Sequence, residues 1–213
     1  MKHRVMKYGV PLLGCLKILI TMEMLAVNNA QAQLQTVTRY CNPLDVIIAD
    51  PFVLRDGDLY YLYGTSAPGE GYHVWTSPDL VNWWWRGFAF QKTASSWGQS
   101  HFWAPEVLKW KDKFYLFYSA HGVTQSLRLG LAASESPLGP FVDIKTPLFD
   151  SDKAWIDGHP FVDSDGTPYL YFVKDVSENP QSEIYVAEMQ PDLMGLKEPF
   201  TFCLKPSGGW EGN

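Results

Sequence analysis

The sequence is poor in cysteine and in positive charge. Of three cysteines in 213 residues, only Cys41 and Cys203 lie outside the leader described below. Two distant thiols form neither a disulfide framework nor a metal cluster, and we expect them to be unpaired, although a bond between them stays open. Lysine and arginine total 17 against 23 acidic residues, a net charge of −6. Because nucleic-acid binding needs a concentrated basic surface, no nucleic-acid partner is expected.

Charged residues are also few, at 19% of the chain, while hydrophobic residues make up 46%. This is too little charge for a disordered chain and enough apolar material for a folded core. Aromatic residues reach 15%, with nine tryptophans. Flat apolar rings stack on sugars or peptides, but they are also ordinary strand residues, so composition alone leaves both uses open.

The first 32 residues have the pattern of a secretory signal peptide. A basic start at residues 2–7 leads into a largely apolar stretch at 8–27, and Ala30-Gln31-Ala32 supplies small residues for cleavage. We therefore expect an exported chain, secreted or periplasmic, whose mature part is residues 33–213.

Two other interpretations of this leader are weaker. Leu12-Leu13-Gly14-Cys15 loosely resembles a lipoprotein cleavage site, but the chain stays apolar after Cys15, where a mature N-terminus should turn polar. A membrane span is disfavoured because Lys17 and Glu23 interrupt the apolar stretch, and each charge in a bilayer core costs a few kcal/mol. No membrane span is therefore expected.

One pattern recurs three times after the leader. Each copy has a short apolar strand, a turn containing Asp-Gly or Lys-Asp, and an aromatic strand. The copies begin with Asp50-Pro51-Phe52-Val53-Leu54, Trp103-Ala104-Pro105-Glu106-Val107-Leu108 and Asp157-Gly158-His159-Pro160-Phe161-Val162. Aligning Pro51, Pro105 and Pro160 gives spacings of 54 and 55 residues. Two strands joined by such a turn predict a β-hairpin at the start of each copy.

A third apolar strand follows in each copy, at residues 71–76, 127–133 and 183–188, and a short outer strand is expected to complete the unit. Four antiparallel strands repeated at this period predict the blades of a β-propeller, and no long helical pattern separates them. The sequence holds three blades and the start of a fourth, so we expect an all-β, incomplete propeller. Its two end sheets would lack a neighbour, which should make the chain marginally stable alone.

Carboxylates recur near the start of each predicted first strand, at Asp50, Glu106 and Asp157. The first strands of propeller blades line a common channel, so we expect these side chains to converge. An acid among apolar neighbours is costly to bury unless it is paired or used, although each aspartate could instead cap a turn. Converging carboxylates beside aromatic rings suit glycoside hydrolysis, in which one acid and one base act on a stacked sugar.

Three motifs together resemble those of glycoside hydrolase family 43: Ala49-Asp50-Pro51, Trp103-Ala104-Pro105-Glu106, and Ile156-Asp157-Gly158-His159-Pro160-Phe161. The resemblance spans roughly residues 40–210. It implies a five-bladed β-propeller glycosidase of the α-L-arabinofuranosidase, β-xylosidase or endo-arabinanase type. Such an enzyme would hydrolyse arabinose- or xylose-containing plant cell-wall polysaccharides or oligosaccharides by inversion. The resemblance implies no required cofactor, although some members hold a calcium ion in the channel.

The resemblance also assigns catalytic roles. Asp50 matches the general base, and Asp157 matches the aspartate that modulates the pKa of the general acid. Glu211 is the glutamate nearest the expected position of the acid, but Gly212-Asn213 follows it where the family has Gly-Pro or Ala-Pro. The acid could therefore lie beyond Asn213, in which case this chain would be inactive even where folded.

Candidate substrate-binding residues surround these acids near the inner strands. They are Phe52, His101, Trp103, Glu106, Ser119, His121 and His159. Each could equally be a packing or hydrogen-bonded residue of the channel wall. The five histidines lack metal-ligand spacing, so no metal site is predicted from them.

Two non-enzymatic interpretations compete with a glycosidase. A catalytically inactive, carbohydrate-binding propeller would keep the aromatic wall but lack the acid. A protein-binding propeller scaffold is disfavoured because it has no need for acids at equivalent channel positions. Propellers that cleave fructans are disfavoured because their Asn-Asp-Pro-Asn-Gly type of opening is absent.

Overall fold

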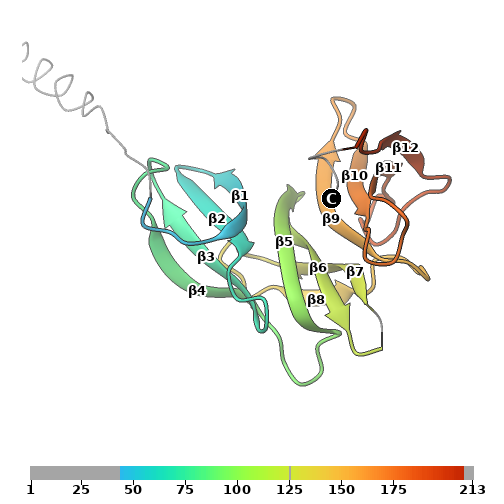
Figure 1. The fold of residues 1–213 in the computed structure, drawn as a ribbon. Coiled ribbons are helices and arrows are strands. Elements are labelled where there is room, and N and C mark those ends of the chain that lie inside the picture. The colour runs from blue at the N-terminus through green and yellow to red at the C-terminus, as the bar shows by residue number, and fades with distance from the viewer. Residues whose placement is uncertain (1–43, 125, 209–213) are drawn as a thin grey trace, which may run out of the picture. The chain divides into compact units, whose positions relative to one another are not determined.

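The computed structural model describes residues 44–124 and 126–208, which form three four-stranded sheets (Figure 1). The predicted signal peptide at 1–32, Cys41 and Glu211 lie outside these residues. The described part of the chain contains no helix, and therefore none long and apolar enough to cross a membrane. Cys203 is exposed and its thiol is free.

Each sheet is antiparallel, and its strands follow one another in sequence order. The first blade consists of β1 (Ala49–Asp56), β2 (Leu59–Thr65), β3 (Gly71–Ser77) and β4 (Trp84–Gln91). The second consists of β5 (Gly98–Trp110), β6 (Lys113–Gly122), β7 (Leu127–Ser134) and β8 (Val142–Lys145). The third consists of β9 (Trp155–Val162), β10 (Pro168–Lys174), β11 (Glu183–Glu188) and β12 (Thr201–Leu204). The predicted four-strand unit and its three copies are confirmed.

The hairpins form where the turn residues accept a left-handed backbone. Gly57 has a φ of 60° between β1 and β2, and Gly166 has a φ of 85° between β9 and β10. Glycine adopts these values without a steric penalty, so the Asp-Gly pairs end each first strand and start the second. In the second blade Lys111 takes the same role with a φ of 55°.

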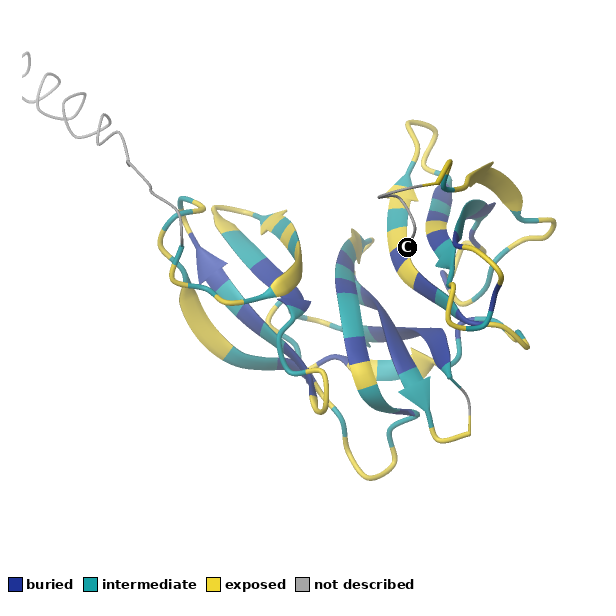
Figure 2. Ribbon diagram, in the orientation of Figure 1, coloured by how far each residue is buried: buried dark blue, intermediate teal, exposed yellow. Residues whose placement is uncertain are grey.

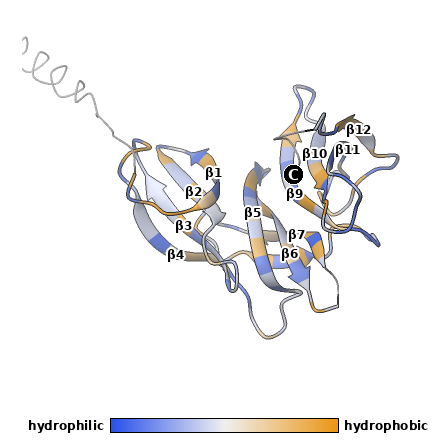
Figure 3. Cartoon of the chain, viewed as in Figure 1, coloured by the Kyte–Doolittle hydropathy of each residue, from blue (hydrophilic) through white to orange (hydrophobic). Residues whose placement is uncertain are grey.

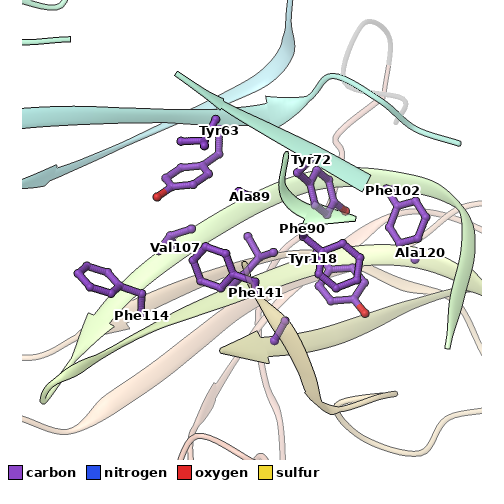
Figure 4. Close-up of a cluster of buried hydrophobic side chains, with 13 residues drawn as sticks. Tyr63, Tyr72, Ala89, Phe90, Phe102, Val107, Phe114, Tyr118, Ala120 and Phe141 are labelled. Carbon is purple, nitrogen blue, oxygen red and sulfur yellow. The ribbon is translucent and has the colours of Figure 1, made fainter. Parts of the chain in front are cut away.

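The first and second blades bury a core of aromatic side chains between them. Tyr72 on β3 and Phe90 on β4 contact Phe102 on β5 and Tyr118 on β6, with ring centroids 5.3–6.2 Å apart (Figure 4). Tilted and edge-on rings at this spacing pack more favourably than face-to-face rings. This core holds the first strands of the two blades against each other.

The second blade is buried on both faces. Along β6, Leu116 and Tyr118 belong to the core with the first blade, while Phe117 between them belongs to a second core. Successive strand residues point to opposite faces, so the run of apolar residues in β6 contributes to both cores. Figures 2 and 3 colour the strands of this blade by burial and by hydropathy. The second core is completed by Leu170 and Phe172 of β10 in the third blade.

Apolar side chains remain exposed on the outermost strands of the first and third blades. Trp84 and Trp85 on β4 are 50% and 60% exposed, and Phe202 and Leu204 on β12 are 48% and 55% exposed. The outermost strands of the two end blades therefore carry exposed apolar residues, while the predicted uncovered sheet faces stay a prediction. That the chain is marginally stable stays a prediction.

Candidate active site

Each first strand carries a β-bulge at the same place. In β1, β5 and β9 the regular pairing with the second strand is interrupted at Asp50, Ala104 and Asp157. These three residues have φ values of 49°, 40° and 55°. A bulge bends the strand and redirects a side chain, and non-glycine residues with positive φ are strained and concentrate at functional sites. The bulges therefore mark equivalent points of the three blades.

The bulges align the three repeat copies differently from the alignment on Pro51, Pro105 and Pro160. The residues that follow the bulges and pair again with the second strand are Phe52, Glu106 and His159. Asp157 is thus the direct equivalent of Asp50, and the bulges lie 54 and 53 residues apart. The proline alignment was wrong by two residues in the third copy because register is set by the bulge.

Asp50 is held by a chain of hydrogen bonds that crosses from the first blade to the second. The Thr65 hydroxyl, at the end of β2, donates to Asp50 Oδ2 at 2.6 Å. The Thr65 hydroxyl oxygen, Oγ1, accepts a hydrogen bond from the backbone N–H of Ala104 at 2.9 Å. The bulge of the second blade therefore orients the hydroxyl that orients Asp50. Thr65 was not among the predicted site residues. It could have been found from its pairing with Ala49, the residue directly before the bulge.

Asp157 is anchored one blade further on through its backbone N–H, as Ala104 is, and not through its carboxylate. Ser119, paired with Trp103 as Thr65 is with Ala49, is completely buried, and its Oγ accepts the backbone N–H of Asp157 at 2.9 Å. This points to a role in holding the strand, since a buried hydroxyl with this partner does not face a sugar.

Tyr72 of the first blade braces the same region. Its hydroxyl lies 3.1 Å from both the Trp103 and the Ser119 carbonyl oxygens. Burial, together with nearby carboxylates that include Asp157 and Asp50, raises the pKa of Tyr72 well above its ordinary value. The phenol therefore stays protonated and continues to donate a hydrogen bond.

The electrostatic surroundings of Asp157 differ from those of an ordinary surface aspartate. Asp157 remains partly accessible to solvent. Even so, desolvation of its carboxyl by surrounding protein atoms raises the pKa of Asp157 to about 6, and the negative charges of Asp50, Asp175 and Glu106 raise it further. Three acids from three strand regions thus act on the Asp157 carboxyl, while the convergence of Asp50, Glu106 and Asp157 on one catalytic channel stays a prediction. Asp175 was not foreseen, because it follows β10 outside the repeat motif.

Asp157→Asn should stabilise the protein more at neutral than at acid pH. The folded state binds the Asp157 proton more tightly than the unfolded state, whose pKa is near 3.8, so stability falls as pH rises from about 4 to about 6 and the loss persists above that. Asparagine removes this loss. We expect the Tm difference between variant and wild type to be more positive at about pH 7.5 than at about pH 4. An equal difference at both pH values, or the same trend in the exposed-turn variant Asp58→Asn, would contradict the assignment.

Glu106 and His159 form a pair between the second and third blades. His159 Nδ1 lies 2.6 Å from Glu106 Oε2. Burial raises the pKa of Glu106 above its ordinary value, and the hydrogen bond and charge of His159 offset part of that rise. Both residues occupy the position two after a bulge, so the tertiary structure brings equivalent positions of neighbouring blades into contact.

The remaining predicted residues lie on β1, β5 and β6. His101 on β5 stacks on His121 of β6, with ring centroids 4.1 Å apart, and its Nδ1 lies 2.9 Å from Ser100 Oγ. Burial and the neighbouring His101 lower the pKa of His121, which favours a neutral imidazole. Trp103 packs on a small cluster around Ile156, and Phe52 packs against the core of the first two blades. Phe52 and Trp103 are both only partly buried.

A channel calcium ion fits the described residues poorly. Within residues 44–124 and 126–208 no three His, Cys, Asp or Glu side chains are grouped so as to hold a metal. His101 and His121 offer nitrogen atoms, whereas calcium takes oxygen ligands. We assign no step of the chemistry to a metal.

The site thus contains two aspartates, Asp50 and Asp157, at equivalent bulges of two blades, beside the half-buried Glu106. Residues 40–212 match the sequence profile of Glycosyl hydrolases family 43. The chain belongs to this family. The all-β propeller prediction is confirmed by the three sheets and by the likeness to solved members described next.

Two solved structures resemble the family 43 chain over most of its length. A thermostable family-43 glycoside hydrolase is 48% identical, with a TM-score of 0.78, and the match covers 82% of this chain and 59% of that one. The endo-arabinase from Bacteroides thetaiotaomicron is 28% identical, with a TM-score of 0.72, and the match covers 79% and 60%.

Curated relatives match shorter parts. An extracellular exo-α-(1→5)-L-arabinofuranosidase of Cellvibrio japonicus is 36% identical over 86 residues, which cover 37% of this chain and 24% of the relative. A xylosidase/arabinosidase of Bacteroides ovatus is 28% identical over 155 residues, covering 65% and 47%. The matched part of the chain thus spans between a quarter and a half of these two relatives, and about three fifths of the two solved structures.

Proposed function

We propose that this protein is an exported glycosidase that releases arabinose or xylose units from plant cell-wall polysaccharides or oligosaccharides with inversion of configuration. The observation that carries the proposal is the pair of aspartates at equivalent bulges, Asp50 and Asp157, each anchored through its neighbouring blade and electrostatically coupled to the other. Family membership, and relatives named as an arabinofuranosidase and a xylosidase/arabinosidase, support the substrate class.

Asp50 serves as the general base in this proposal. Its carboxylate takes a proton from a water molecule while the water oxygen bonds to the anomeric carbon from the face opposite the leaving group. The bond from that carbon to the glycosidic oxygen breaks, and a protonated glutamate supplies the proton that the leaving oxygen needs. The Thr65 hydrogen bond keeps the Asp50 carboxylate in one orientation toward that water molecule.

Asp157 acts on the general acid rather than on the sugar. A negative charge near a glutamate raises that glutamate's pKa, which keeps the acid protonated near neutral pH. Glu211 is the proposed acid within this chain and lies outside the described residues. An acid encoded after Asn213 would fill the same role. His101, Trp103, Glu106 and His159 are the proposed sugar-contacting residues, because each lies on an inner strand and keeps exposed surface.

The test is an assay for hydrolysis with a stereochemical readout. The protein, together with any residues encoded after Asn213, is incubated with 4-nitrophenyl α-L-arabinofuranoside, 4-nitrophenyl β-D-xyloside and linear arabinan. Release of nitrophenol or pentose is expected, and proton NMR of the first-formed sugar should show the inverted anomer. Retention would refute the roles of Asp50 and Asp157. A folded protein that binds arabinan or xylan but hydrolyses none of these substrates would instead indicate a carbohydrate-binding propeller.

A further inference from the structure

Beyond the sugar contacts proposed above, the Glu106–His159 pair lies beside Asp157, one of the two aspartates of the proposed mechanism. Glu106 comes from β5, and His159 from β9, two residues after Asp157. The Glu106 side chain is 26% exposed and that of His159 is 52% exposed. A carboxylate that is mostly buried normally needs a partner, and the imidazole supplies it from the neighbouring blade.

We propose that Glu106 and His159 act as a coupled positioning pair, in which Glu106 places negative charge beside Asp157 and His159 limits how much of that charge Asp157 experiences. The inference rests on the proposed function for the catalytic meaning of Asp157, but its physical content does not depend on turnover. The pair acts through Asp157, so Glu106 and His159 are positioning residues in this respect.

The geometry supports the coupling. The imidazole can donate Nδ1–H to Glu106 Oε2 when the ring is protonated or when its neutral form carries the proton on Nδ1, and at 2.6 Å this contact is short enough to hold the carboxylate in one place. Glu106 in turn acts on Asp157 through its charge. The contact also requires that the second and third blades be docked, since its two partners come from different sheets.

The Asp157 carboxyl is also affected by charged groups other than Glu106 and His159. Asp50 of β1 and Asp175 after β10 also act on Asp157 and are untouched by changes at Glu106 or His159. Tyr72 of β3 is a neutral phenol. Among the three acids that act on Asp157, Glu106 is therefore the one shown in hydrogen-bond contact with a histidine, which can offset its charge.

The experiment is an NMR titration of the aspartate carboxyls in protein labelled with ¹³C at the aspartate side chain. The Asp157 resonance is assigned by its absence from Asp157→Asn. Glu106→Gln removes a negative charge and should lower the titration midpoint of Asp157. His159→Ala exposes Asp157 to the unpaired Glu106 carboxylate and should raise the midpoint. His159→Asn, whose side-chain N–H can replace Nδ1–H, should move it less than His159→Ala does.

The control is Glu135→Gln, which also removes one negative charge but lies in the exposed ion pair with Lys113 at the end of β7. Its Asp157 midpoint should equal that of the wild type. An unchanged midpoint in Glu106→Gln, or shifts in the same direction for Glu106→Gln and His159→Ala, would overturn the proposal. If His159→Ala does not fold, as judged by its amide spectrum, Glu106→Gln and His159→Asn decide the question.

The titration separates this inference from the proposed function. Opposite shifts without any glycoside hydrolysis would support the pair and refute the enzyme. Hydrolysis without shifts would support the enzyme and refute the pair.

Discussion

Asp50→Asn is expected to lower kcat for 4-nitrophenyl α-L-arabinofuranoside or β-D-xyloside by a factor of about 10² to 10⁴, with little change in KM, because general base catalysis contributes this much to rate. Asparagine has nearly the same shape and still offers an oxygen to the Thr65 hydroxyl, which donates to Asp50 at 2.6 Å. The substitution therefore removes proton acceptance and leaves the hydrogen-bond chain from Ala104 in place.

Asp58→Asn is the matched control, since Asp58 is an exposed acid at the opposite end of the same hairpin. It should leave kcat within about twofold of the wild type. Initial rates at several substrate concentrations separate kcat from KM. If Asp50→Asn retained wild-type kcat while Asp58→Asn behaved as expected, Asp50 would not be the base. A rise in KM alone would make Asp50 a sugar-binding residue.

Tyr72→Ala is expected to lower the free energy of unfolding by about 3–5 kcal/mol, the usual cost of removing a buried aromatic side chain. Tyr72 is completely inaccessible to solvent and contacts Phe90, Phe102 and Tyr118 in the core between the first two blades. The cavity left by alanine would lie where the two blades meet, so their docking should weaken together with global stability.

Tyr72→Phe separates packing from hydrogen bonding. It keeps the ring but leaves the Trp103 and Ser119 carbonyl groups without the phenol, so we expect a loss of about 1–3 kcal/mol. Urea unfolding followed by far-UV circular dichroism measures both variants. Tyr60→Ala, at a half-buried position on β2 of the same sheet, should cost less than Tyr72→Ala. Equal losses for these two alanine variants would contradict the central place of Tyr72 in the core.

Several features of the chain were predictable from sequence because they depend on neighbouring residues. Turns such as Asp56-Gly57 and Asp165-Gly166 need a residue that accepts positive φ, and an Asp-Gly pair in the sequence predicts such a turn. The apolar and aromatic run of β6 lies directly after a turn, and such a run next to turn residues predicts a strand. The repeat of about 54 residues showed that the same local pattern was used three times.

The register of the third copy was not predictable from its proline. Pro160 lies two residues beyond the position that Pro51 and Pro105 occupy, because Gly158 and His159 follow the bulge in β9. A bulge depends on how a strand pairs with its partner, and single-sequence patterns do not report pairing. Asp157 was nevertheless selected as a candidate, since it is an acid near the start of a predicted first strand and its motif resembles that of the family; its catalytic role stays a prediction.

The sequence by itself determined the strands, the hairpins, the three-fold repeat and the family, all of which follow from local turn chemistry, strand periodicity and short motifs. The tertiary structure was needed to show which groups meet: Thr65 with Asp50 inside the first blade and with the Ala104 backbone N–H of the second, and Glu106 with His159 between the second and third blades. These residues are separated by 15 to 53 positions, and their contact requires both the bulges and the docking of one apolar sheet face on another. The physical reason is that a local pattern sets the direction of one strand, while contacts between blades depend on the packing of many distant side chains.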